Sequence, residues 1–208
     1  METPLAQLSL APTWPLWAVA AGAMMLADFW LTLWAARPAL RAGAVYELNP
    51  WLRSAVTAQR WFSGPFMAAV LGVIVMLGLI GSLVRNAGEV FLFYALCSGI
   101  IMTRLHLVIL HLLNRLRPIR RSAAPTRPLT IPAALLKLAK QQTALAVVWT
   151  VAVRLNSLAW LQPWLVGAAA GFVLMAAMSL FWHEIELRRL RRLYPAHATA
   201  SLKNKSRP

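Results

Sequence analysis

Two pairs of polar residues stand inside long apolar runs and are the side chains best suited to chemistry. Asp28 is the only ionisable residue in 14–36, and Thr32 follows it four positions later. Arg104 and His111 stand seven positions apart in another apolar run. Residues at these spacings lie on one face of a helix, so each pair would present its polar groups in a common direction. Such groups could bind a small polar or anionic ligand, or they could hold two helices in register.

The composition argues against an ordinary soluble domain. Of the 208 residues, 60% are hydrophobic and 13% are charged, whereas soluble domains average about 45–50% and about 25%. The formal net charge is +15, but the Lys and Arg residues gather between apolar runs. This distribution is typical of a multi-pass protein in a bilayer with anionic lipids, and we expect no nucleic-acid partner.

Apolar runs of about 20 residues can cross a bilayer as helices. We expect an all-α polytopic membrane protein with five transmembrane helices, or with four if the fourth run lies at the surface. The expected spans cover 14–36, 61–84, 90–113, 138–156 and 158–182. Arg37-Pro38 would end the first span, because proline disfavours helical geometry in the preceding residue. Pro50 would begin a short surface helix that ends near Arg60.

The positions of Lys and Arg predict which side each connection faces. With five spans, 18 of the 21 Lys and Arg residues lie on one side, in 37–60, 114–140 and 183–208. The positive-inside rule then places the N-terminus outside and the C-terminus in the cytoplasm. We expect the protein to lie in the inner membrane of a bacterium. Residues 1–182 would form one transmembrane domain, and 183–208 would form a basic cytoplasmic tail. The first 13 residues contain no Lys or Arg, so we expect no cleaved signal peptide.

This topology places the polar residues at similar depths. Asp28 lies nine residues from Arg37, roughly 13 Å along a helix. Arg104 lies about ten residues from the cytoplasmic end of its span. A charge within a membrane span needs a partner, so we predict an ion pair between Asp28 and Arg104. His111 would lie nearer the cytoplasm on the same face as Arg104.

Two residues of the following loop could close this site from the cytoplasmic side. Glu47 would be the most suitable proton acceptor if a reaction occurs, and Asn49 could either join the site or cap a helix. In the site itself, Arg104 would contact an anionic group and Asp28 would orient Arg104. The candidate ligand-binding residues are Asp28, Thr32, Glu47, Asn49, Arg104 and His111.

Three functions remain open at this point. The first is a membrane protein with a cytoplasm-side polar pocket for a lipid headgroup or another small polar ligand. The second is an assembly or scaffold subunit of a membrane complex, in which the ion pair only fixes helix packing. It would bind a membrane protein partner or a second copy of the chain. The third is an intramembrane enzyme acting on lipid-linked substrates, which requires a nucleophile or metal site that the sequence does not reveal.

The remaining motifs give no reason to expect a metal or a cofactor. Cys97 is the only cysteine, so the chain cannot form an internal disulfide or a cysteine-rich zinc site. His106 and His111 belong to the same expected span, which leaves a haem between helices without a second deep histidine. The sequence contains no HExxH motif, phosphate-binding P-loop, GxGxxG motif or nucleophile elbow.

Residues 25–67 resemble a functionally uncharacterised family of small prokaryotic multi-pass membrane proteins. That family has Asp-x-x-x-Thr late in its first span, with Leu directly before the Thr, then Glu-Leu-Asn-Pro, and often Gly-Pro-Phe at the start of its second span. The matching residues are Asp28, Leu31, Thr32, Glu47, Leu48, Asn49, Pro50, Gly64, Pro65 and Phe66. The loop before Glu47 is slightly longer than usual, and the lysine often found in the second span has no counterpart here. The resemblance implies a membrane fold but no activity.

Overall fold

The computed structural model describes residues 13–41, 50–116 and 130–193, and these residues form helices without any strand. The helices are α1 (Trp14–Arg41), α2 (Pro50–Thr57), α3 (Gly64–Leu83), α4 (Ala87–Leu116), α5 (Thr130–Leu155), the short 3-10 helix η2 (Ala159–Leu161) and α6 (Gln162–Leu193). The expected all-α class is therefore confirmed. Glu47 and Asn49 lie outside the described residues.

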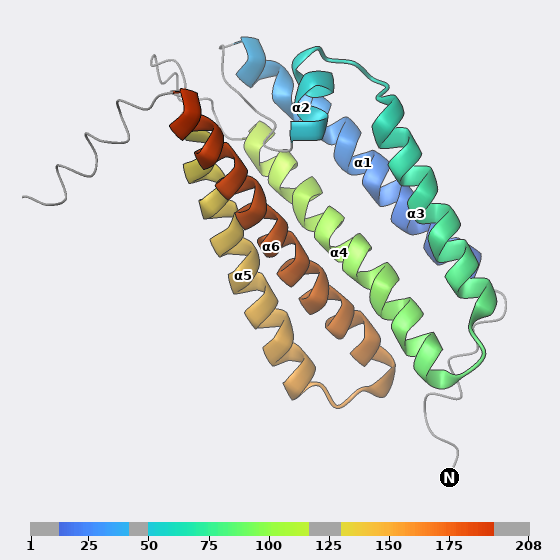
Figure 1. The fold of residues 1–208 in the computed structure, drawn as a ribbon. Helices are drawn as coiled ribbons and strands as arrows, with labels where there is room; N and C mark the ends of the chain where they lie inside the picture. Colours follow the sequence, from blue (N-terminus) through green and yellow to red (C-terminus); the bar gives the residue numbers. More distant parts are fainter. Residues whose placement is uncertain (1–12, 42–49, 117–129, 194–208) are drawn as a thin grey trace, which may run out of the picture.

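The long helices form a row in which each contacts its neighbours along much of its length. α1 packs against α3 and α4, and α6 packs against α4 and α5 (Figure 1). α1, α4 and α6 run in one direction, whereas α3 and α5 run in the other. α3 and α4 meet at their connecting turn and diverge toward α2, and α1 lies behind the opening.

Within the described residues, four segments are long and apolar enough to cross a membrane. They are Trp14–Pro38, Gly64–Leu83, Ala87–Leu113 and Ala159–Leu193. These segments confirm the expected multi-pass class. α5 has 26 residues but is not among them, because Lys137, Lys140 and two glutamines interrupt its apolar sequence.

Two helices extend further than the sequence predicted. The apolar span of α1 ends at Pro38, as predicted, but the helix itself continues to Arg41, so the proline does not end the helix. Proline lacks a backbone N–H and here deprives the carbonyl of Trp34 of its helical partner, but so close to the helix end this loss concerns a single bond. α6 is one uninterrupted helix to Leu193, well beyond the expected end of the last span at residue 182.

Local capping fixes the turns that join the helices. The Asn86 side chain accepts a hydrogen bond from the Glu89 N–H at 3.0 Å, and the Glu89 carboxylate accepts one from the Asn86 N–H at 3.3 Å. This reciprocal capping box starts α4. α2 ends in a Schellman motif, in which the Arg60 N–H donates to the Ala55 carbonyl at 2.9 Å. Gln59 takes the left-handed position of that motif with φ of 51°.

The row is held together by apolar clusters and by close helix crossings. One cluster joins α1, α2 and α3 around Phe29, Val56 and Phe66, with the two phenylalanine rings stacked at 4.7 Å. A second cluster joins α1, α3 and α4 around Leu77, Phe93 and Cys97 at the opposite end. The polar face of α1, with Asp28, lies against α4 at the level of the first cluster.

Glycines allow α4 and α6 to approach backbone to backbone. A Cβ atom at Gly167 would collide with the Ala95 carbonyl, and one at Gly171 would lie 2.7 Å from the Gly99 carbonyl oxygen. Small residues four positions apart on both helices are typical of close packing between membrane helices. The crossing also fixes α4 and α6 in parallel, because the N-terminal halves of both helices meet there.

Candidate functional site

The interface of α1 and α4 brings together four of the six predicted site residues. Asp28 and Thr32 lie one turn apart on α1, and Arg104 and His111 lie two turns apart on α4. Because α1 and α4 run in the same direction, the more N-terminal residue of each pair meets its counterpart, and so does the more C-terminal one. The contacts between them form a continuous polar cluster, which we call the α1–α4 polar site.

The predicted pair of Asp28 and Arg104 forms directly. Arg104 Nη1 donates to Asp28 Oδ2 at 3.0 Å. The Asp28 side chain is only 8% exposed, whereas the Arg104 side chain is 31% exposed. A buried carboxylate requires such a partner because burial without one would cost several kilocalories per mole. The pair therefore places a partly exposed guanidinium in an otherwise apolar row of helices.

The Thr32 hydroxyl links the site to His111. Thr32 Oγ1 lies 2.7 Å from the backbone carbonyl of Asp28 and 2.8 Å from His111 Nε2. The hydroxyl has one hydrogen, and the carbonyl can only accept, so that hydrogen goes to Asp28. His111 Nε2 must then carry a hydrogen and donate it to Thr32 Oγ1. The His111 imidazole is therefore in its Nε2–H form.

The second carboxylate oxygen of Asp28 has no aligned donor among the described residues. His111 Nε2 is 3.3 Å from Asp28 Oδ1, but its N–H is directed toward Thr32, and Oδ1 accepts no hydrogen bond. Arg104 likewise uses only Nη1, for Asp28, in the described part of the chain. The site thus offers one buried acceptor and several guanidinium N–H donors to a molecule that could reach both.

The arrangement does not match a catalytic triad. In a triad, the carboxylate and the nucleophilic hydroxyl contact opposite nitrogens of the imidazole. Here Asp28 and Thr32 both lie beside Nε2 of His111, and the Thr32 hydroxyl donates to a backbone carbonyl. Within the described ranges, no three His, Cys, Asp or Glu residues are grouped as metal ligands would be.

Neighbouring polar residues on α4 face away from the site. Thr103 donates to the Gly99 carbonyl at 2.7 Å and packs beside Gly171 of α6, so its hydroxyl is not part of the site. His106 lies against Phe172 of α6, with ring centroids 5.5 Å apart. Cys97 is fully buried.

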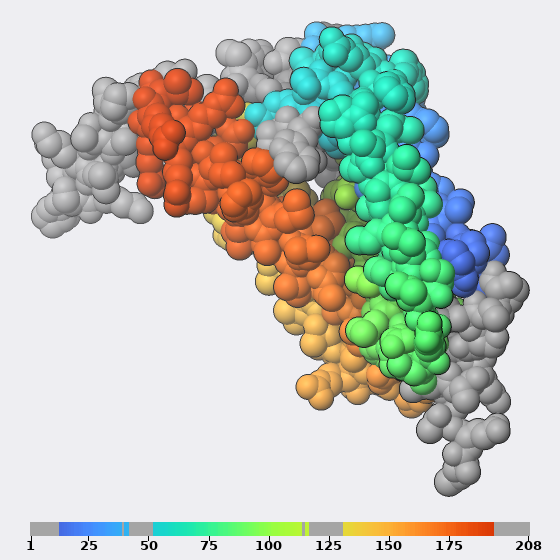
Figure 2. Space-filling model, turned by 45° about the vertical axis from the view of Figure 1, so that its right-hand side comes forward, coloured from blue at the N-terminus to red at the C-terminus, as the bar shows by residue number. Residues whose placement is uncertain are grey.

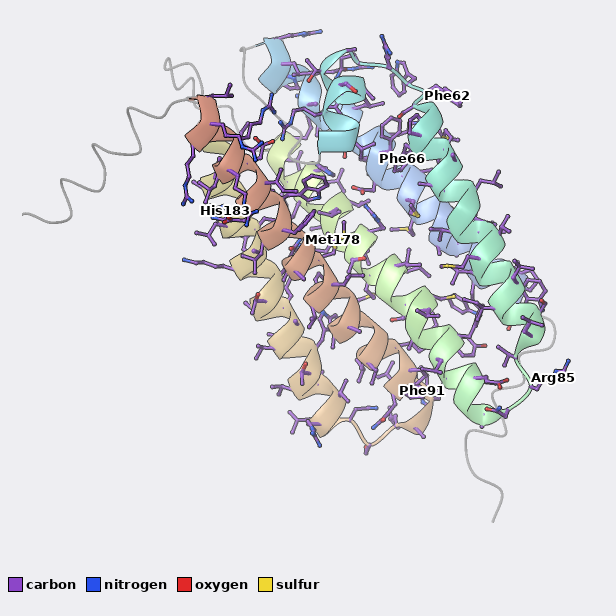
Figure 3. The ribbon with its side chains drawn as sticks, viewed as in Figure 1. Phe62, Phe66, Arg85, Phe91, Met178 and His183 are labelled. Carbon is purple, nitrogen blue, oxygen red and sulfur yellow. The ribbon has the colours of Figure 1, made fainter. Side chains whose placement is uncertain are left out.

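Figure 2 shows a furrow between α3 and α6, with residues of α4 at its floor. In Figure 3, Phe66 near the start of α3 lies toward α1, whereas Arg85 marks the turn where α3 and α4 converge. The α3 and α4 helices are therefore closest at that turn and lie further apart toward α2.

A second ion pair connects α2 to the end of α6. Arg53 Nη1 donates to Glu186 Oε1 at 3.1 Å, and the Glu186 side chain is largely buried. This pair was not predicted from the sequence, in which the two residues are 133 positions apart. The pair holds α2 near the open end of the furrow.

Sequence reasoning also missed a buried polar pair between α5 and α6. Ser179 donates to Gln142 Oε1 at 2.9 Å, and Gln142 Nε2 has no acceptor among the described residues. Both residues interrupt apolar sequence, as Asp28 and Arg104 do, so that same signal could have predicted them. A shallow hollow elsewhere on α5 and α6 is lined by Thr150, Arg154, Asn156 and Gln162, among others, and includes no residue of the α1–α4 polar site.

No protein-family model, curated protein or solved structure matches the chain. The resemblance of residues 25–67 to a prokaryotic membrane family therefore stays a prediction. The α1–α4 polar site is therefore the basis of the proposed function.

Proposed function

We propose that the protein is a five-span bacterial inner-membrane protein whose α1–α4 polar site binds a lipid headgroup or another small polar ligand. One observation carries this proposal. The Arg104 side chain is 31% exposed in the middle of an apolar helix, with a single acceptor among the described residues. Ionisable residues at such positions commonly mark ligand or ion pathways, because exposure to hydrocarbon alone is costly.

The five-span arrangement is supported by the direction of α4 and α6. Their parallel crossing at Ala95 and Gly167 requires the chain to return between them, and α5 is the helix that lies antiparallel beside α6. α5 would be about 39 Å long at the usual helical rise, which exceeds the hydrocarbon thickness of about 30 Å. Gln142 lowers its hydropathy but is buried against Ser179, away from lipid.

The charge distribution supports the cytoplasmic placement of the α2 end. Arg188, Arg189, Arg191 and Arg192 stand in the last turns of α6 at this end, whereas Arg85 and Arg154 stand at the other. Arginines at the cytoplasmic surface attract anionic lipids, each contributing about 1 kcal/mol. Anionic lipids are therefore the proposed surface partner of this end.

Native mass spectrometry in mild detergent tests ligand binding. The wild-type protein is expected to retain a lipid or small polar molecule that Arg104→Gln loses. Arg85→Gln is the matched control, because it removes an exposed arginine at the α3–α4 turn, away from the site. A ligand-free wild type, or equal ligand in Arg104→Gln and Arg85→Gln, would contradict the proposal.

The second candidate is a scaffold or assembly subunit, and the same ion pair favours it in one respect. Asp28 and Arg104 connect α1 and α4, which lie inside the row, so the pair could serve only to set their register. A charge-swapped protein with Asp28→Arg and Arg104→Asp distinguishes the two. If the swap restores both stability and phenotype after each single change has lost them, the scaffold function is favoured.

A further inference from the structure

The α1–α4 polar site has unused hydrogen-bonding groups of two kinds, an acceptor on Asp28 and donors on Arg104. Asp28 Oδ1 is a buried carboxylate oxygen that accepts no hydrogen bond, although the Asp28 side chain is only 8% exposed. Arg104 has guanidinium N–H groups beyond the one that contacts Asp28, and its side chain is partly exposed. A complementary ligand would therefore donate a hydrogen bond to Asp28 and accept hydrogen bonds from Arg104.

The charges of the site restrict that ligand further. Asp28 and Arg104 compensate each other, so a simple anion at Arg104 would also meet the Asp28 carboxylate. A simple cation at Asp28 would meet the Arg104 guanidinium. A molecule with both charges close together avoids either repulsion and enters a site of low dielectric with no net charge.

Resting on the proposed binding function, we infer that the ligand is a zwitterion with an ammonium N–H group beside an oxyanion. The ammonium would donate to Asp28 Oδ1, and the oxyanion would accept from Arg104, whose planar fork suits phosphate or carboxylate. The ethanolamine-phosphate group has this chemistry. It occurs both as a phospholipid headgroup and as a soluble molecule.

The Thr32–His111 hydrogen bond strengthens this assignment. Because the His111 Nε2–H is directed to Thr32 Oγ1, it does not satisfy Asp28 Oδ1 even at 3.3 Å. The threonine hydroxyl thereby keeps the carboxylate oxygen available to another donor. The furrow between α3 and α6 in Figure 2, with α4 at its floor, is the side from which such a donor would approach.

A methylation series of the headgroup tests the inference directly. Binding of phosphatidylethanolamine, its N-methyl and N,N-dimethyl forms and phosphatidylcholine, all with the same acyl chains, is measured by native mass spectrometry on delipidated protein. All four carry the same charges, but only phosphatidylcholine lacks an ammonium N–H. We expect the first three to bind at least roughly tenfold more tightly than phosphatidylcholine, the size expected for a charge-assisted hydrogen bond.

Variants identify the side chain that accepts the hydrogen bond from the ammonium N–H of the ligand. Asp28→Asn should abolish the preference over phosphatidylcholine. Glu186→Gln, which neutralises another largely buried and ion-paired carboxylate, should keep it. Soluble O-phosphoethanolamine, with phosphocholine as its control, identifies the source. Asp28-dependent competition by O-phosphoethanolamine alone would favour a soluble ligand, and binding of the lipid without such competition would favour a headgroup.

The possible failures are distinguishable. If wild-type protein binds phosphatidylcholine as tightly as phosphatidylethanolamine, and Arg104→Gln loses both, the zwitterion inference is wrong but the binding function stands. If wild-type protein binds none of the lipids and neither soluble compound, the zwitterion inference is overturned. The proposed binding function is then decided separately, by whether the wild type retains a molecule that Arg104→Gln loses.

Discussion

At the scale of single residues, hydrogen-bond direction gives the α1–α4 polar site its properties. Thr32 has one hydrogen to give, and the Asp28 carbonyl takes it at 2.7 Å. This forces His111 to be the donor in the contact at 2.8 Å. The Asp28 carboxylate consequently keeps one oxygen without an aligned partner while the other holds Arg104. A single hydroxyl thus determines which groups of the site remain available.

Changing that hydroxyl should have a measurable cost. Thr32→Val keeps the shape of the side chain but removes the acceptor of the His111 N–H, and we expect a loss of about 1 kcal/mol in unfolding free energy. Thr32→Ser keeps both hydrogen bonds and should lose less than half as much. Denaturation by sodium dodecyl sulfate in mixed micelles measures the difference. A larger loss in Thr32→Ser than in Thr32→Val would show that packing of the methyl group, rather than the hydroxyl, matters.

The buried pair of α5 and α6 allows a second residue-scale prediction. Ser179→Ala leaves Gln142 Oε1 without its donor, and burying an unpaired polar group costs about 1–3 kcal/mol. Gln142→Leu combined with Ser179→Ala removes both polar groups, including the Gln142 nitrogen that already lacks an acceptor. We expect the double variant to be at least as stable as the wild type in the same denaturation assay. A double variant less stable than the wild type would contradict this.

At the scale of helices, the apolar periodicity predicted the existence of each long element, whereas packing set the ends and partners. The sequence predicted the pairing of Asp28 with Arg104 because both interrupt apolar runs at matched depth. It could not predict the contact of Thr32 with His111, which depends on the relative rotation of α1 and α4. Arg53 and Glu186 were missed for a related reason, since either could equally have been solvated. Helix ends shifted because a proline near a terminus removes only one bond, as at Pro38.

The crossing of α4 and α6 gives the prediction at this scale. Gly167→Ala would place a Cβ against the Ala95 backbone, which cannot move as a flexible side chain could. Overpacking of this kind typically costs about 1–3 kcal/mol. Gly72→Ala on α3 is the control, because a Cβ there meets nothing within 4 Å and alanine favours the helix. Thermal unfolding in detergent should show a lower midpoint for the first variant only, and equal midpoints would contradict the close crossing.

At the scale of the whole molecule, the row of helices is asymmetric along the direction in which they run. One end carries α2, the ends of α1, α4 and α6 and most of the described basic residues. The other end carries two short turns with Arg85 and Arg154. The α3 and α4 helices converge at this second end and diverge toward the first.

This arrangement gives a topology prediction that separates five spans from four. In a Cys97→Ala background, single cysteines replace the exposed Ser54 of α2 and Ser157 of the turn after α5. With five spans these positions lie on opposite sides, so a membrane-impermeant maleimide should label Ser157→Cys in intact cells, and Ser54→Cys only after the membrane is opened. A surface-lying α5 would instead leave both positions on one side of the membrane. Equal labelling of the two cysteines in intact cells would therefore rule out α5 as a span and, with it, the parallel crossing of α4 and α6.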